Sequence, residues 1–228
     1  MKFSFASTLV MASAAVAFSA APVVTLGQTA AAESAPLWQI QARASSLTFN
    51  TTKAGAAGVG GIVETMQFTR YSGGLEANGR MQLKIDLSSI DTGISIRDER
   101  LQTLFWNVAN APSVTFTGQL KADDQKKLLK EPVALEVEGS MTMAGVTKPI
   151  KAQLQVTPVN GKLWVSTRRP ILVKAEDFGL TPGVEALRAI MGLNFLAGTV
   201  PVNFQLELSK AAPEKVATNA VMPPSAWS

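Results

Sequence analysis

The residues best suited to chemistry in this sequence are carboxylates, because the chain contains no cysteine and no histidine. Ser–His and Cys–His nucleophiles, zinc sites built on His or Cys, and thiol redox centres therefore lack their parts. Asp91, Thr92, Arg97 and Asp98 are the residues that most resemble a catalytic group. Tight turns and helix caps require the same residue types. We therefore predict structural roles for these four residues, and no catalytic or metal-binding residue.

A carboxylate-dependent enzyme would need two acidic side chains that converge inside the fold. Asp86, Glu136, Glu138 and Glu207 all occupy polar positions in segments where apolar and polar residues alternate. Side chains in that phase are expected to face water. Such an enzyme remains an alternative, and it is the less favoured one.

The elements that position these residues are mostly strands, because apolar residues recur with a period of two. The alternation is regular over 81–87, 133–143, 150–156 and 200–208, and weaker over 38–50, 61–70, 114–120 and 163–174. Strands with one apolar face usually pair in antiparallel sheets. Asn78-Gly79 and Asn160-Gly161 are typical of hairpin turns, and we expect Gly73-Gly74 to be a turn as well. Eight or so strands without a βαβ unit predict a sandwich or a closed barrel.

Two segments have helical spacing instead. The first helix is expected to begin at Ser95, with Asp98 completing a capping box. The second begins near Thr181, with Pro182 in its first turn, and breaks at Gly192. The apolar residues that follow helical spacing in these segments are Leu101, Leu104, Phe105, Val184, Leu187, Ile190 and Met191. Short helices of this kind are expected to cover the mouth of a barrel.

The two ends of the chain differ from the segment between them. After Lys2, residues 3–26 carry no charge, and three alanines precede Glu33 as a small-residue cleavage site. This order is typical of a secretory signal peptide, which places the protein in the periplasm. A transmembrane anchor is the alternative, because the uncharged run is long enough to span a bilayer. We predict a signal peptide over 1–32, one domain over 33–210 and a disordered tail over 211–228.

The charge of the chain is mildly basic. Its 21 Lys and Arg residues and 17 Asp and Glu residues give a formal net charge of +4. The densest basic clusters are Lys126-Lys127 with Lys130, and Arg168-Arg169. Two small clusters do not make a nucleic-acid interface. We predict solvated turns there, and the alternative is a transient contact with an anionic membrane surface.

Three motifs carry a resemblance to a known family. The first motif is Ser88 to Gly93, continued by Arg97-Asp98, Leu101 and Pro112 to Phe116. The second is Met143 to Ile150, and the third is Asp177 to Leu180. In order and spacing they resemble the signatures of the YceI-like family of polyisoprenoid-binding, lipocalin-like periplasmic proteins. The likeness covers nearly all of 38–208. It departs from the family pattern at Ala144, which replaces the usual His, and at 104–107, which replace a more acidic, aromatic stretch.

The resemblance implies an all-β fold: an antiparallel eight-stranded lipocalin-like barrel with one or two short helices at its mouth. It also implies a periplasmic carrier that holds a polyisoprenoid-type chain or a quinone-like lipid, without catalysis or a resident cofactor. A homodimer is a further interaction that the family suggests. The alternative is a packed barrel that partners a membrane redox component. The residues expected to line the apolar cavity are Phe68, Met81, Leu83, Ile85, Leu104, Phe105, Phe116, Val137, Met141, Met143, Leu154, Phe178, Val202, Phe204 and Leu206.

The leader generates the first prediction. We expect the mature protein to begin close to Glu33 and to be released with the soluble periplasmic fraction, because the uncharged run ends at a small-residue cleavage site. Intact-mass measurement of the protein from its native cells checks this. Recovery of a chain that still carries Met1 in the membrane fraction would contradict it.

Overall fold

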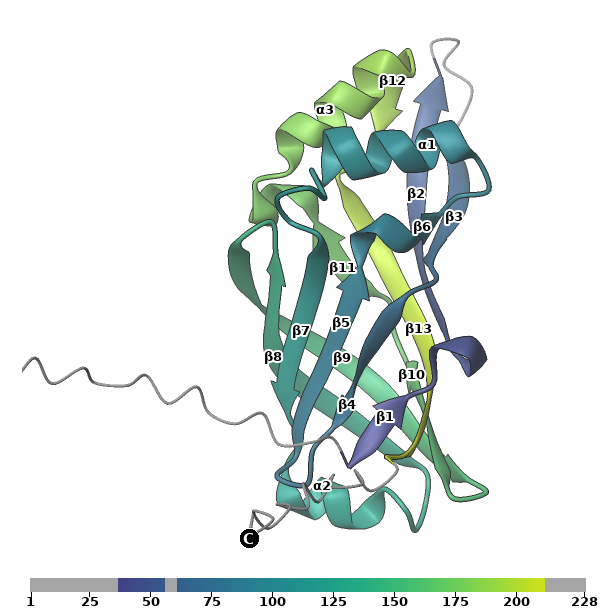
Figure 1. Cartoon of the computed structure of the whole chain (residues 1–228), viewed down its shortest axis with the longest axis vertical. Helices are drawn as coiled ribbons and strands as arrows, with labels where there is room; N and C mark the ends of the chain where they lie inside the picture. The colour runs from purple at the N-terminus through teal and green to yellow at the C-terminus, as the bar shows by residue number, and fades with distance from the viewer. Residues whose placement is uncertain (1–36, 56–60, 212–228) are drawn as a thin grey trace, which may run out of the picture. The chain divides into compact units, whose positions relative to one another are not determined.

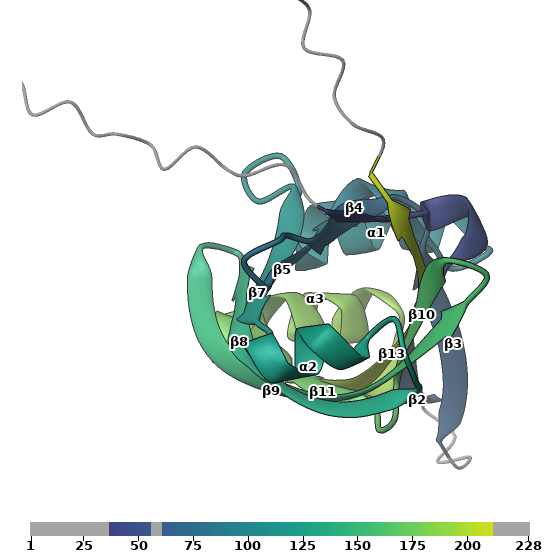
Figure 2. The same ribbon diagram turned by 90° about the horizontal axis from the view of Figure 1, so that it is seen from below.

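The barrel domain accounts for the described part of the chain, which in this computed structural model comprises residues 37–55 and 61–211. The predicted signal peptide and nearly all of the predicted tail lie outside the described residues. Eight strands close into a ring in which every pair of neighbours is antiparallel. Figure 2 shows the ring from one end. The antiparallel eight-stranded barrel predicted from the sequence is therefore confirmed.

The ring is built from strands that follow one another along the chain. Its order is β1 (Trp38–Ile40), β4 (Tyr71–Leu75), β5 (Arg80–Asp86), β7 (Ser113–Gln119), β8 (Val133–Met143), β9 (Val146–Val159), β10 (Lys162–Thr167) and β13 (Thr199–Lys210). The last strand, β13, returns to pair with β1, with Trp38 opposite Lys210 and Ile40 opposite Leu208. This closure removes the unpaired strand edges that an open sheet would expose.

Four of the barrel strands are interrupted, and a second strand continues each of them. The continuations are β2 (Ser46–Gly55) after β1, β3 (Ile62–Phe68) before β4, β6 (Ile90–Asp91) after β5 and β11 (Ile171–Lys174) after β10. Each continuation pairs with the continuation of the neighbouring strand or with β13, so neighbours along the chain remain neighbours in the sheet. The interruptions divide the predicted strands 38–50 and 163–174. Alternation resumes beyond each break, so the pattern alone does not reveal it.

Tight turns join the regular strands. Asn160-Gly161, between β9 and β10, has φ of 51° and 76°, and Ala144-Gly145, between β8 and β9, has φ of 50° and 77°. Two successive residues with positive φ form the type I′ turn that suits a twisted hairpin. Ala144 adopts this conformation without the freedom of glycine, at a cost of about 1–2 kcal/mol.

Gly73-Gly74 is not the turn that we predicted, because both residues lie within β4. A Cβ atom on Gly73 would lie 2.0 Å from the Gln82 carbonyl oxygen of β5, and one on Gly74 would lie 1.7 Å from the Trp38 carbonyl oxygen of β1. The two glycines therefore let β4 approach both neighbouring strands closely.

Helices occupy both ends of the barrel. Figure 1 shows α1 (Ser95–Arg100) and α3 (Thr181–Ile190) at one end, called here the helical end, and α2 (Ala122–Lys127) at the other. A π-helical turn (Leu101–Phe105) continues α1 and packs against α3. The packing is close, because a Cβ atom on Gly183 would lie 2.9 Å from the Phe105 Cα. The helices at the mouth were expected, whereas α2 replaces the predicted solvated turn at Lys126-Lys127.

The predicted capping box at Ser95 is wrong. Ile94 precedes the helix without a side-chain cap, and Ser95 is its first residue. The Asp98 carboxylate instead reaches back to Thr92, where Oδ1 accepts hydrogen bonds from the backbone N–H (3.0 Å) and from Oγ1 (2.6 Å). Asp98 thus fixes the turn before the helix and does not take part in a capping box.

The second predicted helix ends where the sequence indicated. Gly192 has φ of 60°, and β12 (Leu193–Leu196) follows and pairs with the end of β2. Val184 and Leu187 are buried, but Ile190 is exposed because the helix ends there, so it does not belong to the buried stripe. No helix among the described residues is both long and apolar enough to cross a membrane.

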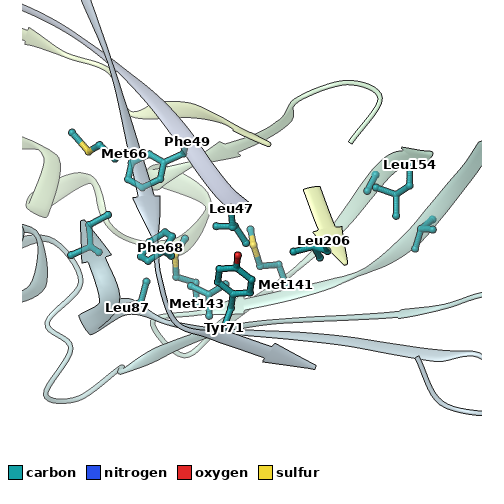
Figure 3. Packing of buried hydrophobic residues seen from close by; sticks show 14 of the residues in the cluster. Leu47, Phe49, Met66, Phe68, Tyr71, Leu87, Met141, Met143, Leu154 and Leu206 are labelled. Atoms are coloured by element: carbon teal, nitrogen blue, oxygen red, sulfur yellow. The ribbon is translucent and has the colours of Figure 1, made fainter. Parts of the chain in front are cut away.

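The inward faces of the strands form one apolar core. Figure 3 shows side chains that converge from β2, β3, β8 and β13, with Phe49 and Phe68 stacked at a centroid distance of 5.6 Å. Leu47, Val137 and Leu163 are among the most deeply buried residues. The alternation seen in the sequence therefore corresponds to the inside and the outside of the barrel.

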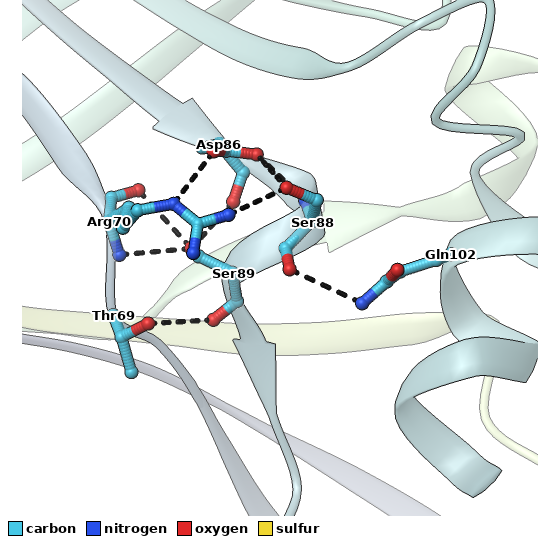
Figure 4. A network of polar contacts seen from close by, with 6 residues as sticks. All are labelled: Thr69, Arg70, Asp86, Ser88, Ser89 and Gln102. Atoms are coloured by element: carbon cyan, nitrogen blue, oxygen red, sulfur yellow. Dashed lines mark hydrogen bonds and ion pairs between the residues drawn. The ribbon is translucent and has the colours of Figure 1, made fainter. Parts of the chain in front are cut away.

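A network of polar contacts stabilises the segment that joins β5 to β6 (Figure 4). Arg70 donates from Nε to Asp86 (2.9 Å) and from Nη2 to Ser88 Oγ (2.7 Å). Ser88 donates its backbone N–H to Asp86, and Ser89 donates its hydroxyl to the Asp86 carbonyl oxygen at 2.6 Å. Gln102 of the π-helical turn donates to the Ser88 carbonyl oxygen at 3.2 Å. The first signature motif therefore holds the helical end onto the barrel.

We expect Gly74→Ala to lower the free energy of unfolding by about 3 kcal/mol, because a methyl group there would overlap a backbone oxygen that cannot move away. Urea denaturation measures the change. Gly55→Ala in β2 is the matched control, since a Cβ atom at Gly55 would have nothing within 4 Å. A loss of similar size in both variants would contradict the close-approach explanation.

The Asp86 network gives a pH dependence. Burial of the Asp86 carboxyl opposes its ionisation, but hydrogen bonds from Ser88 and Arg70 outweigh burial and hold its pKa below the ordinary value of 3.8. A carboxyl with a lowered pKa stabilises the fold at higher pH, and this contribution is lost as the pH falls through the folded-state pKa. Wild type should therefore be more stable than Asp86→Asn at neutral pH.

That advantage of the wild type should shrink as the pH falls below about 3.8. Thermal melts between pH 7 and pH 3 test this. Asp123→Asn removes an exposed carboxylate that pairs with the exposed Lys126 of α2, and it should leave stability at neutral pH nearly unchanged. A wild-type advantage over Asp86→Asn that stays constant over the whole pH range would refute the role of the carboxylate.

Candidate functional site

The candidate site is a cavity of about 270 Å³ inside the barrel. Its wall includes Leu128, which follows α2, and Val184 and Leu187 of α3. Because α2 and α3 lie at opposite ends of the barrel (Figure 1), the cavity extends along most of its length. An extended apolar chain therefore fits this space better than a compact molecule does.

The wall is made of side chains that neighbouring strands bring into register. Leu83 of β5 lies opposite Phe116 of β7, which lies opposite Met141 of β8. On the other side, Val156 of β9, Val165 of β10 and Leu206 of β13 form a similar row. These rows follow from the alternation, since residues of one phase on paired strands face the same side of the sheet.

Methionine gives this wall its adaptability. Five residues on the wall are methionines: Met66, Met81, Met141, Met143 and Met191. Their unbranched side chains can change rotamer to follow an irregular guest. The volume lies just under the range of roughly 300–1,000 Å³ that is typical of small-molecule sites. A long guest would therefore enter as these side chains move aside.

Most of the residues predicted to line the cavity lie on its wall. They are Phe68, Met81, Leu83, Ile85, Phe105, Phe116, Met141, Met143, Leu154, Val202, Phe204 and Leu206. Eleven of these come from barrel strands or their continuations, and their phase in the alternation was sufficient to find them. Phe105 comes from the π-helical turn.

Three predicted residues lie off the wall. Leu104 is 42% exposed, because the π-helical turn directs it away from Phe105. Val137 is deeply buried but packs toward Gly118, where a Cβ atom would lie 3.1 Å from its methyl group. Phe178 is buried in the 3₁₀ turn Ala175–Phe178 that precedes α3.

None of the four carboxylates assigned to the polar phase lines the cavity. Glu207 nevertheless does not face water as predicted, because its side chain is only 9% exposed and binds Lys162 at 2.8 Å. The segment before β2 covers it on the outside of the barrel, where Ser45 Oγ accepts a hydrogen bond from the Glu207 backbone N–H. Glu207 is therefore a buried structural group on the outer face.

Four charged residues at the helical end of the cavity were not predicted as site residues. They are Lys53 of β2, Glu64 of β3, and Arg97 and Arg100 of α1. The Glu64 carboxylate accepts hydrogen bonds from Lys53 Nζ at 3.0 Å and Arg97 Nη1 at 2.7 Å. Arg97 also donates from Nη2 to the Thr92 carbonyl oxygen at 2.7 Å. This group of contacts attaches α1 to the extended edge of the barrel.

The environment keeps the Glu64 carboxyl ionised. Burial opposes its ionisation, but hydrogen bonds from Lys53 and Arg97 outweigh burial and lower the pKa of Glu64. Arg97 has the structural role that we predicted for it, and its partner Glu64 comes 33 residues earlier in the chain. The sequence feature that could have predicted a charged group at this end of the cavity is the spacing of Arg97 and Arg100, because residues three apart share one face of a helix.

The cavity can enclose an apolar chain and offers little for bond chemistry. Among the described residues, Glu64 is the single carboxylate on the wall of the cavity, and two cations bind it. Within the described ranges, no group of three or more His, Cys, Asp or Glu residues is placed to hold a metal ion.

Comparison with known proteins places the chain in a family. The YceI-like domain model matches residues 38–208. Curated proteins named Protein YceI, from Salmonella arizonae and Salmonella paratyphi B, are each 29% identical to it over 107 residues, which are 45% of this chain and 52% of theirs. The chain thus spans about half the length of these curated relatives.

Two solved structures share the fold. A polyisoprenoid binding domain from Saccharophagus degradans, implicated in plant cell wall breakdown, is 31% identical, with a TM-score of 0.72 over 78% of this chain and 100% of that domain. BcnA from Burkholderia cenocepacia is 15% identical, with a TM-score of 0.55 over 74% of this chain and 98% of BcnA. Because the family match extends over 38–208 and includes nearly the whole barrel, the chain belongs to the YceI-like family.

Proposed function

We propose that this protein is a periplasmic carrier that holds a polyisoprenoid-type chain inside its barrel and catalyses no reaction. The observation that carries the proposal is the cavity, whose wall is apolar along most of the barrel. The likeness to a polyisoprenoid binding domain, at 31% identity, supports the choice of ligand class. The leader-like sequence before Glu33 supports export.

Apolar burial alone is strong enough to hold such a ligand. Each buried methylene contributes about 0.8 kcal/mol, so a five-carbon isoprene unit contributes roughly 3–4 kcal/mol. Association costs on the order of 4–15 kcal/mol. One unit therefore does not overcome the cost, whereas several units do so without any charged contact.

The cavity also favours a carrier over the two alternatives. A packed barrel would fill its interior with side chains, whereas this one retains a space that reaches from α3 to Leu128. A carboxylate enzyme would need a second acidic group beside Glu64, and the part of the chain that the structure describes places none on the wall.

We expect affinity to rise steeply with chain length and then to level off once the cavity is full, because each added isoprene unit buries more apolar surface. Titration of a series of prenyl alcohols of increasing length, followed by tryptophan fluorescence or calorimetry, measures this. Equal affinity at every length, or no binding at any length, would rule out the carrier.

We expect Ala152→Trp to shorten the longest chain that binds. Ala152 is a small, buried wall residue of β9, so a large ring there would fill part of the cavity. Ala134→Trp is the matched control, because Ala134 is exposed on β8. If Ala152→Trp lowers stability, Ala152→Leu gives a smaller obstruction with the same expected direction. Unchanged length selection in folded protein of both Ala152 variants would argue against binding in this cavity.

A further inference from the structure

Exposed apolar side chains are concentrated at the helical end of the barrel. Of the eleven large apolar residues that are exposed in the described part of the chain, seven lie there, on β3, α1 and the residue before it, the π-helical turn, α3 and β12. Figure 1 shows β3, α1, α3 and β12 together at this end. The seven residues, called here the apolar rim, are Ile62, Val63, Ile94, Ile96, Leu104, Ile190 and Phe195. Single exposed apolar residues are common on protein surfaces, whereas a concentration of them marks an interaction surface.

The apolar rim adjoins the cavity. Five of its members directly precede a wall residue in the chain. The five pairs of rim and wall residue are Val63 and Glu64, Ile96 and Arg97, Leu104 and Phe105, Ile190 and Met191, and Phe195 and Leu196. Ile62 pairs across the sheet with Lys53, which also lines the wall. The apolar rim therefore lies around this end of the cavity.

The cavity opens to solvent at the helical end and is closed at the other. Lys53 and Glu64 line its wall, yet 24% and 25% of their side chains stay exposed. Ionised groups are tolerated there because water still reaches them. At the end near α2, by contrast, the wall residues Leu120 and Leu128 are each only 4% exposed. A guest therefore enters the cavity past the apolar rim.

The helical end carries no formal net charge. Its elements are β2, β3, α1, the π-helical turn, α3 and β12, and together they contain four Lys or Arg residues and four Asp or Glu residues. Some of these charges form ion pairs, such as Arg188 with Glu185 at 2.8 Å. Attraction of a charged partner would need an excess of one sign. This surface therefore suits a partner that it meets through apolar contact.

A lipid bilayer is the partner that fits these features. The guest of the proposed function is an isoprenoid chain, and a chain of several units stays in a bilayer because every unit placed in water is unfavourable. A carrier must therefore collect its guest at the bilayer surface. A second copy of the chain, or a soluble partner protein, would also cover the apolar rim, but it would block the entrance to the cavity.

We propose that the apolar rim docks on the surface of a lipid bilayer and places the open end of the cavity against it. Side chains such as Ile96 and Phe195 enter the boundary between head groups and acyl chains, as the apolar faces of interfacial helices do. The inference rests on the proposed function, because the guest is the reason for meeting a bilayer. It differs from a contact through the basic residues Lys126 and Lys127, which lie on α2 at the opposite end and would need an anionic surface.

Flotation with vesicles of phosphatidylcholine tests the docking surface. Wild type should float with the vesicles. Ile96→Glu and Phe195→Glu should each bind them at least about fivefold more weakly, because a charged group replaces apolar surface that would enter the bilayer. Leu129→Glu is the matched control and should bind as wild type does, since Leu129 is as exposed as Ile96 but follows α2 at the other end. All variants keep the same two chain ends, so a difference between them belongs to the substituted side chain.

Ile96→Trp gives a test of opposite sign. The indole ring favours the interface between a membrane and water, so this variant should bind the vesicles at least as tightly as wild type, with an unchanged thermal melt. A loss of binding as large as that of Ile96→Glu would show that position 96 acts through the fold, and it would overturn the docking surface. Absence of vesicle binding by wild type, or equal weakening in Leu129→Glu, would overturn it as well.

Lipid charge and salt distinguish the forces involved. Binding through the apolar rim should change by less than about twofold when phosphatidylglycerol is added to the vesicles or when salt is raised, because little of it is electrostatic. Binding that needs phosphatidylglycerol and is lost on Lys127→Gln would place the contact on α2 and overturn the proposal. Sedimentation covers the remaining occupant, since a wild-type dimer that Phe195→Glu converts into a monomer would assign the apolar rim to a second copy.

Guest transfer separates this proposal from the carrier itself. A fluorescent prenyl alcohol should pass from vesicles to wild type faster than to Ile96→Glu, whereas the same alcohol supplied from cyclodextrin should bind both with equal affinity. Equal transfer from vesicles to both would overturn the docking surface and leave the carrier standing. No binding of the alcohol from either source would overturn the carrier, while flotation would still assign the apolar rim to a bilayer.

Discussion

Closure of the sheet between β13 and β1 is the constraint on which the rest of the structure depends. Trp38 and Lys210 meet across this seam, and the Lys210 Nζ lies 5.9 Å from the centre of the Trp38 ring, within reach of a cation–π attraction. Once the ring is closed, every strand must turn one phase of its alternation inward. An apolar phase that would coat one face of an open sheet thereby becomes the wall of a cavity.

The two ends of this barrel are built differently, and the difference matters for function. At the end near α2, hairpins such as Asn160-Gly161 close the strands with short turns. At the helical end, β2 and β3 run beyond the ring, and the α1 segment attaches to them through Arg97 and Glu64. The charged side chains on the wall of the cavity, among the described residues, lie at this attachment. One end of the cavity thus acquires charge as a consequence of how the helix is held.

Local patterns in the sequence predict what depends on neighbouring residues. The phase of alternation identified the barrel strands and most of the wall, and Asn-Gly pairs identified turns. These local patterns do not predict contacts between distant segments. Gly74 allows the strand that contains Trp38 to approach closely, and Arg97 pairs with Glu64. The predicted capping box at Ser95 is absent for a related reason, because the Asp98 carboxylate accepts hydrogen bonds from Thr92 and not from the start of the helix.

The cavity itself is costly, and this cost bears on its purpose. Space left unfilled in a protein core lowers stability, by about 24 cal/mol for each Å³ left by a truncated side chain. This cost is set against a total stability of only about 5–15 kcal/mol for a typical domain. Larger residues at small wall positions such as Ala152 would recover part of it. Under the carrier proposal a guest offsets this cost, because a ligand that binds only the folded state stabilises that state.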